Sequence, residues 1–136
     1  MEKIRATISK LPGWILTAAT TLLILWLTLA PNPLGDDAPT LFPGADKVVH
    51  ALMFGFLVTM ILLDRERKDG WLPVKDAWIV GSVAASALLG AAIEVAQLLM
   101  GVGRGFEWAD MGADAIGASI CGYGWRQLQH FWSITE

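Results

Sequence analysis

Two aspartates near the end of the chain, Asp110 and Asp114, stand four residues apart in a stretch that is otherwise apolar and rich in glycine. Such a stretch predicts a membrane-spanning helix, in which a charged side chain near mid-membrane costs at least about 2.5 kcal/mol. Residues four apart share one face of a helix. The two carboxylates are therefore expected to serve a function, and the question is which groups they face.

Two further groups of polar residues stand near the ends of other apolar runs. Asp46, Lys47 and His50 open one run, where Asp46 is expected to cap the helix. Glu94 and Gln97, three residues apart, lie near the end of another. A structural interpretation stays open for each group. In the first group, Asp46 would cap the helix and also satisfy His50. In the second, Glu94 and Gln97 would form a hydrogen bond between helices.

The connection over residues 101–108 carries three glycines around Arg104. Such a backbone can turn tightly and present the guanidinium, which suits bidentate recognition of a carboxylate or a phosphate. The alternative is an ion pair between Arg104 and Glu107 or Asp110.

Four segments are long and apolar enough to cross a membrane, about residues 12–30, 47–63, 77–100 and 109–128, since a span needs roughly 17–25 residues. The hydrophobic fraction of 54% and the mean hydropathy of +0.51 exceed the balance of a soluble domain. The first segment has no charge, and its apolar core is longer than that of a signal peptide. We predict an all-α membrane protein, a four-transmembrane-helix bundle forming a single domain over residues 1–136.

The basic residues predict the orientation. Eight of the ten Lys and Arg residues fall on the side that holds both termini and the middle loop, so that side is expected to face the cytoplasm. The charged run over residues 64–69 is then a solvated cytoplasmic turn. The candidate polar groups collect at the opposite, outer end of the bundle, where the small residues Gly117, Ala118 and Cys121 are expected to pack against Ser86, Ala87 and Gly90.

The polar residues, taken together, resemble the VanZ-like family of small bacterial membrane proteins. The resemblance covers about residues 40–122 and rests on three motifs: Asp46-Lys47-x-x-His50, Glu94-x-x-Gln97 and Arg104-x-x-Glu107-x-x-Asp110-x-x-x-Asp114-x-x-Gly117. Asp114 stands where the family more often has Asn. The resemblance implies a multi-pass protein of the bacterial inner membrane, with a link to glycopeptide and lipoglycopeptide resistance in some members.

Three functions stay open at this point. The first is a binding protein for a membrane lipid or a lipid-linked cell-wall precursor, with Asp46, Lys47, Gln97, Arg104 and Glu107 in contact with the ligand. The second is an enzyme on a lipid-linked phosphate substrate, with His50, Glu94, Asp110 and Asp114 as catalytic candidates. The third is a proton- or ion-coupled transporter with Glu94 and Asp114 as relay groups.

The same four candidates, His50, Glu94, Asp110 and Asp114, could bind a divalent cation. Oxygen ligands favour Mg²⁺, Mn²⁺ or Ca²⁺ over a structural Zn²⁺ site. Glu94 and Asp114 are expected to share a proton, a cation or the guanidinium of Arg104. The chain has no basic stripe, so nucleic acid is not expected as a partner, whereas a second copy of the chain or an envelope protein stays open.

Overall fold

The computed structural model describes residues 1–30, 44–101 and 107–135. Within these ranges the chain forms five helices and no strand, which confirms the all-α prediction. α3 and α4 are long and apolar enough to cross a membrane by length and composition, whereas α2 is a shorter apolar helix of 15 residues. The helices are α1 (Glu2–Ile8), α2 (Ile15–Leu29), α3 (Ala45–Lys68), α4 (Asp76–Met100) and α5 (Trp108–Thr135).

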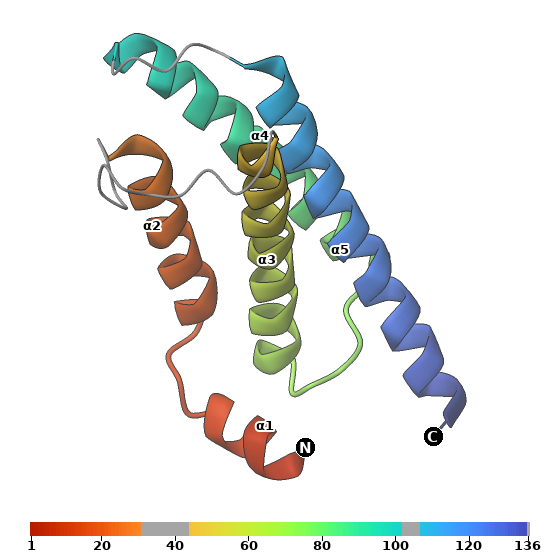
Figure 1. The fold of residues 1–136 in the computed structure, drawn as a ribbon. Helices are drawn as coiled ribbons and strands as arrows, with labels where there is room; N and C mark the ends of the chain where they lie inside the picture. The colour runs from red at the N-terminus through yellow and green to blue at the C-terminus, as the bar shows by residue number, and fades with distance from the viewer. Residues whose placement is uncertain (31–43, 102–106, 136) are drawn as a thin grey trace.

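The four longer helices alternate in direction along the bundle (Figure 1). α2 and α4 end where α3 and α5 begin, and we call this the polar end. Both termini and the connection between α3 and α4 lie at the opposite end, which we call the terminal end. The helices begin and end near the predicted positions, except that α3 continues five residues beyond the predicted span and α5 seven.

α3 and α5 pack closely because glycine lines their contact. A Cβ atom on Gly117 of α5 would overlap the backbone carbonyl of Ala51 in α3, and one on Gly55 would lie 2.7 Å from Sγ of Cys121. Gly117 and Cys121 were expected to pack against the small residues of α4, and that expectation is wrong for these two. On α4, Gly90 is a small residue that lies against α5, where it faces Asp114.

Apolar side chains fill the bundle between its two ends. Phe54, Val58 and Leu62 of α3 are fully buried. Ile24 and Ile93 bring α2 and α4 onto the same core. The interior is therefore apolar around the middle of α3, and this separates the buried polar groups at one end of the helix from those at the other.

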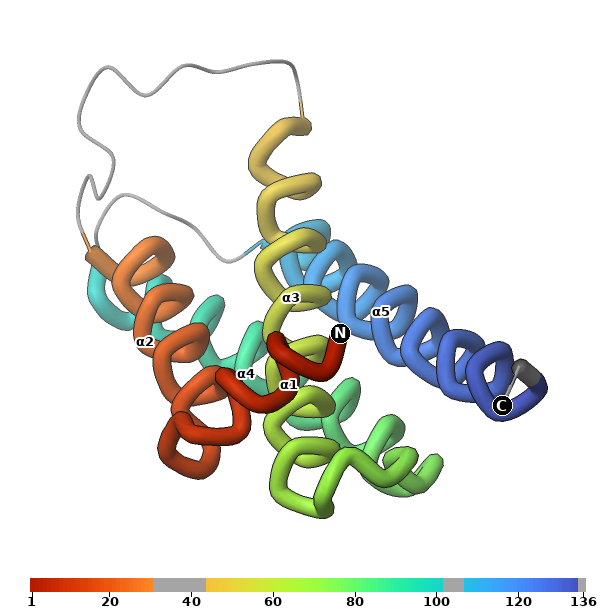
Figure 2. The backbone as a smooth tube through the Cα atoms, turned by 90° about the horizontal axis from the view of Figure 1, so that it is seen from below, coloured from red at the N-terminus to blue at the C-terminus, as the bar shows by residue number. Residues whose placement is uncertain are grey.

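The terminal end is closed by a buried ion pair. Asp64 is completely buried, accepts two hydrogen bonds of 2.8 Å from the backbone N–H and hydroxyl of Thr17, and lies 2.7 Å from Arg67. Arg67 also donates to the carbonyl groups of Ile8, Leu11 and Pro12. The prediction of a solvated turn over residues 64–69 is wrong, because α3 continues and turns Asp64 and Arg67 toward α1 and α2. α1 thereby lies across the terminal end of the bundle (Figure 2).

Candidate functional site

His50 lies at the centre of the polar end, in the second turn of α3. Its Nδ1 atom is 2.9 Å from Oδ1 of Asp114, and its Nε2 atom is 3.8 Å from Oδ2 of Asp110. An ionised carboxylate can only accept a hydrogen bond, so the contact with Asp114 places the proton of a neutral imidazole on Nδ1. Nε2 is then an acceptor that faces Asp110. The spacing of the two aspartates on α5 predicted this shared face.

Gly90 makes room for Asp114. A Cβ atom at Gly90 would lie 2.5 Å from Oδ2 of Asp114, so a larger residue on α4 would displace the carboxylate. Asp114 itself has an exposed fraction of 1%. The small residues of α4 thus contribute to the site as well as to helix packing.

Glu94 brings α4 into the same cluster and is equally buried, with an exposed fraction of 1%. Its Oε2 accepts a hydrogen bond of 3.1 Å from the backbone N–H of Glu107. Its Oε1 is buried and has no hydrogen-bond partner among the described residues. Glu94, His50 and Asp110 each offer one ligand atom within 4.8 Å of the others, which is a grouping that could hold a metal ion.

Lys47 forms the exposed rim of the site. Its ammonium lies 3.1 Å from Asp46, 3.3 Å from Glu107 and 3.6 Å from Asp110. Asp46, Glu107 and Asp110 form a second grouping with metal-ligand spacing. The Lys47 ammonium already contacts all three carboxylates of that outer grouping, so the inner grouping around His50 is the stronger metal candidate.

Three of the predicted roles at this end look different in the structure. Gly44, with a positive φ of 84°, is the N-cap of α3, and the helix has no side-chain cap hydrogen bond, so Asp46 is not the cap. Asp114, rather than Asp46, satisfies His50. Gln97 donates a buried hydrogen bond of 2.7 Å to the carbonyl of Thr28, which ties α4 to α2.

The remaining predicted partner, Arg104, lies outside the described residues, so its expected ion pair with Glu107 or Asp110 stays a prediction. The other predicted residues of this end lie together in the structure, and only Gln97 among the described ones does not join them. The residues that lie together are Asp46, Lys47, His50, Glu94, Glu107, Asp110 and Asp114.

Sequence reasoning missed the terminal end. The i, i+3 spacing of Asp64 and Arg67 at the end of an apolar run was the available signal for the buried ion pair.

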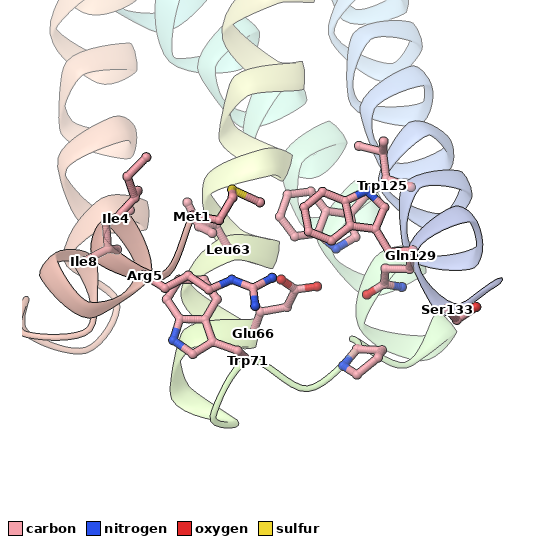
Figure 3. Close-up of a pocket in the computed structure, with 13 residues that line it drawn as sticks. Met1, Ile4, Arg5, Ile8, Leu63, Glu66, Trp71, Trp125, Gln129 and Ser133 are labelled. Carbon is pink, nitrogen blue, oxygen red and sulfur yellow. The ribbon is translucent and has the colours of Figure 1, made fainter. Parts of the chain in front are cut away.

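Beside this end lies a cavity of about 350 Å³ between α1, the end of α3 and the last turns of α5. Aromatic and aliphatic side chains line most of it, and the side chains of Arg5 and Glu66 point toward one another inside it (Figure 3). The cavity contains none of the predicted site residues.

The outside of the bundle carries many large apolar side chains. Large apolar side chains that are more than half exposed occur on all four longer helices, among them Leu22, Leu52, Leu88 and Ile116. Exposed apolar side chains on every longer helix fit a lipid environment. Apolar helices outside and a buried acid–histidine cluster inside define the class: a helical membrane protein with an internal polar site at one end.

The comparison with known families agrees with this class. The model of the VanZ/LLP1 family matches residues 7–128, and the chain belongs to that family. The matched range contains every candidate residue of the polar end, which confirms the resemblance drawn from the three motifs. No curated protein and no solved structure matches the chain.

Proposed function

We propose that this protein is a multi-pass protein of the bacterial inner membrane whose polar end faces outward and binds the phosphate-bearing head group of a lipid-linked envelope or cell-wall component. In this proposal α2 to α5 are the four transmembrane helices, the chain is one domain, and both termini are cytoplasmic. A link to glycopeptide or lipoglycopeptide resistance would follow from binding such a component.

One observation carries the proposal. His50, Glu94 and Asp114 are buried at the same end of three different helices, directly beneath the exposed ammonium of Lys47. Buried ionisable groups in membrane helices are costly and mark functional sites. The rim lysine gives an anionic head group a first contact, while the acyl or prenyl chain of the same molecule can lie against the apolar outer surface.

Lipid retention tests the binding proposal. The protein is placed in phosphatidylcholine nanodiscs that contain a polyprenyl phosphate, and native mass spectrometry measures how much of that lipid stays bound. We expect selective retention of the polyprenyl phosphate over phosphatidylglycerol, and about a tenfold loss of retention in Lys47→Ala and His50→Ala. Arg126→Ala is the matched control, since Arg126 is an exposed residue near the terminal end. Equal retention of both lipids, or unchanged retention in the two variants, would contradict the proposal.

Cysteine labelling tests the orientation separately. In a Cys121→Ala background, Glu107→Cys places a thiol at the polar end and Ser133→Cys places one near the C-terminus. A membrane-impermeant maleimide added to intact cells should label the first variant and not the second. The reverse pattern would place the polar end in the cytoplasm.

A second candidate function is favoured by the 2.9 Å contact between His50 and Asp114. A histidine oriented by a carboxylate is a typical general base. His50 would then remove a proton from a water molecule that attacks the terminal phosphorus of a polyprenyl diphosphate. The bond from that phosphorus to the bridging oxygen would break, the bridging oxygen would leave on the polyprenyl monophosphate, and the attacked group would be released as inorganic phosphate. Release of inorganic phosphate by the wild-type protein and not by His50→Ala would support this function. Retention without release would leave binding alone.

A further inference from the structure

We infer that Nε2 of His50 and the carboxylates of Glu94 and Asp110 form a binding site for one divalent cation, which bridges the polar end to the phosphate of its ligand. The bridging role rests on the proposed function. Cation binding itself does not, and the two are tested separately below.

The geometry of the three side chains suits one cation. Their ligand atoms lie within 4.8 Å of one another, and they come from α3, α4 and α5. A cation held at about 2.1 Å from each ligand needs ligand atoms roughly 3–4 Å apart. Each of the three helices contributes only one ligand, so each side chain can rotate independently of the other two. Small rotations are then enough to bring the ligand atoms into this range.

The unpartnered oxygen of Glu94 is the second, independent observation. Oε1 is buried and has no hydrogen-bond partner in the described part of the chain, although the other oxygen of the same carboxylate is satisfied by Glu107. A buried polar atom without a partner costs about 1–3 kcal/mol, and more when it is charged. Oδ1 of Asp110 is also buried without a hydrogen bond, although the Lys47 ammonium lies 3.6 Å from it. A bound cation would satisfy the buried Glu94 oxygen and add a direct ligand contact for Asp110.

Asp114 acts in this site as a positioning residue. By accepting the hydrogen bond from Nδ1 of His50, it leaves Nε2 free to coordinate a metal and fixes the orientation of the ring. The carboxylate–histidine–metal arrangement is common in metalloproteins, where loss of the outer carboxylate typically weakens metal binding about 10–100-fold. The absence of a side chain at Gly90 leaves the space that this carboxylate occupies on the α4 side.

Charge is the reason why a phosphate ligand needs the cation. The described residues of the polar end include one ammonium, that of Lys47, and five carboxylates. An anionic phosphate approaching that set meets net repulsion. A divalent cation supplies two positive charges at the buried centre of the cluster and gives phosphate oxygens a direct ligand. The five carboxylates belong to Asp46, Glu94, Glu107, Asp110 and Asp114.

The donor atoms indicate the kind of cation. One imidazole nitrogen with two carboxylates suits Mn²⁺ well, because carboxylates favour hard cations while the imidazole favours a transition metal. Mn²⁺ is also paramagnetic, so its binding and its ligands can be observed directly.

The test uses the full chain in detergent, stripped with EDTA and titrated with Mn²⁺. Electron paramagnetic resonance measures free Mn²⁺, and electron spin echo modulation detects coordinated nitrogen. We expect one saturable site with nitrogen modulation that disappears in His50→Ala. Glu94→Gln and Asp110→Asn should each weaken binding at least about tenfold, as should Asp114→Asn. Asp76→Asn is the matched control, because Asp76 is an exposed acid at the start of α4, at the terminal end, and it should bind as the wild type does.

Two results would overturn the inference: no saturable Mn²⁺ binding by folded wild-type protein, or unchanged affinity in Glu94→Gln. Circular dichroism establishes that each variant is folded, and the near-isosteric Glu94→Gln keeps the test valid if His50→Ala does not fold. Retention of the polyprenyl phosphate, measured with Mn²⁺ and with EDTA, separates the two proposals. Retention that persists in EDTA would overturn the cation bridge and leave the proposed function standing. Mn²⁺ binding without retention under either condition would contradict the proposed function and leave the cation site.

Discussion

Replacing Gly117 by alanine should lengthen the contact between His50 and Asp114, although Gly117 is not itself part of the site. The structure gives the expected size of this change. An added Cβ would overlap the carbonyl of Ala51, and real Cβ atoms come no closer than 3.0 Å, so α3 and α5 must separate by about 1 Å. His50 directly precedes Ala51 on α3, and Asp114 lies one turn before Gly117 on α5. The same separation lengthens the 2.9 Å contact between His50 and Asp114 to roughly 3.9 Å, beyond hydrogen-bond range.

Two costs follow from that separation. Overpacking costs about 1–3 kcal/mol, and loss of a hydrogen bond to a charged group costs about 1.5–3 kcal/mol. Thermal unfolding in detergent should therefore show a melting temperature several degrees lower, and the Mn²⁺ titration should show weaker binding. Gly112→Ala is the matched control on the same helix, because nothing lies within 4 Å of its added Cβ. It should gain about 0.5–1 kcal/mol from helix propensity. Unchanged stability and Mn²⁺ affinity in Gly117→Ala would refute the link between helix packing and the site.

Two other variants separate structural from functional polar groups. Arg67→Ala leaves Asp64 buried without its 2.7 Å partner and should lower the unfolding free energy by about 3–5 kcal/mol in denaturant titrations. Arg126→Ala, which removes one partner of an exposed pair, should lower it by less than about 1 kcal/mol. Equal losses in the two variants would show that the Asp64–Arg67 pair does not stabilise the fold as a buried ion pair. Gln97→Leu removes the hydrogen bond to the Thr28 carbonyl and should lower the unfolding free energy by about 1–3 kcal/mol, while the Mn²⁺ affinity stays unchanged. Weaker Mn²⁺ binding with unchanged stability would instead place Gln97 in the site.

The sequence predicted the four longer helices near their observed positions, because each falls on a largely apolar stretch, although only α3 and α4 are long and apolar enough to cross a membrane, and the short helix α1 was not predicted. It also predicted that polar residues from several helices meet at one end, since alternating helix directions bring the start of α3 and α5 beside the end of α4. The i, i+4 spacing of Asp110 and Asp114 was enough to place both carboxylates on one face of α5, but it did not predict that this face meets His50. Spacing within one helix is a local property, and local properties can be read from a single sequence.

The partners across helices could not be predicted in the same way. His50 pairs with Asp114, 64 residues away, rather than with Asp46 on its own helix. That choice depends on the register of α3 against α5, which the contacts of Gly55 and Gly117 determine. The error at the other end has a similar cause. A run of charges predicts a solvated turn, and the burial of Arg67 depends on carbonyl groups near Ile8 and Pro12 that a local pattern does not reveal.

Burial alone does not distinguish a structural polar cluster from a functional one in this protein, whereas charge balance does. At the terminal end, Asp64 meets one guanidinium and two hydrogen-bond donors of Thr17. That carboxylate is neutralised and satisfied. Nε of Arg67 is buried without a hydrogen bond, but the ion pair carries no excess charge for a ligand to compensate. At the polar end, Glu94 keeps a buried oxygen without a partner, and the surrounding carboxylates outnumber the ammonium of Lys47. An excess of buried negative charge persists in a folded protein only if a proton, a cation or a ligand compensates it. If the proposed cation site is correct, the stability of the polar end therefore depends on the cation that it binds.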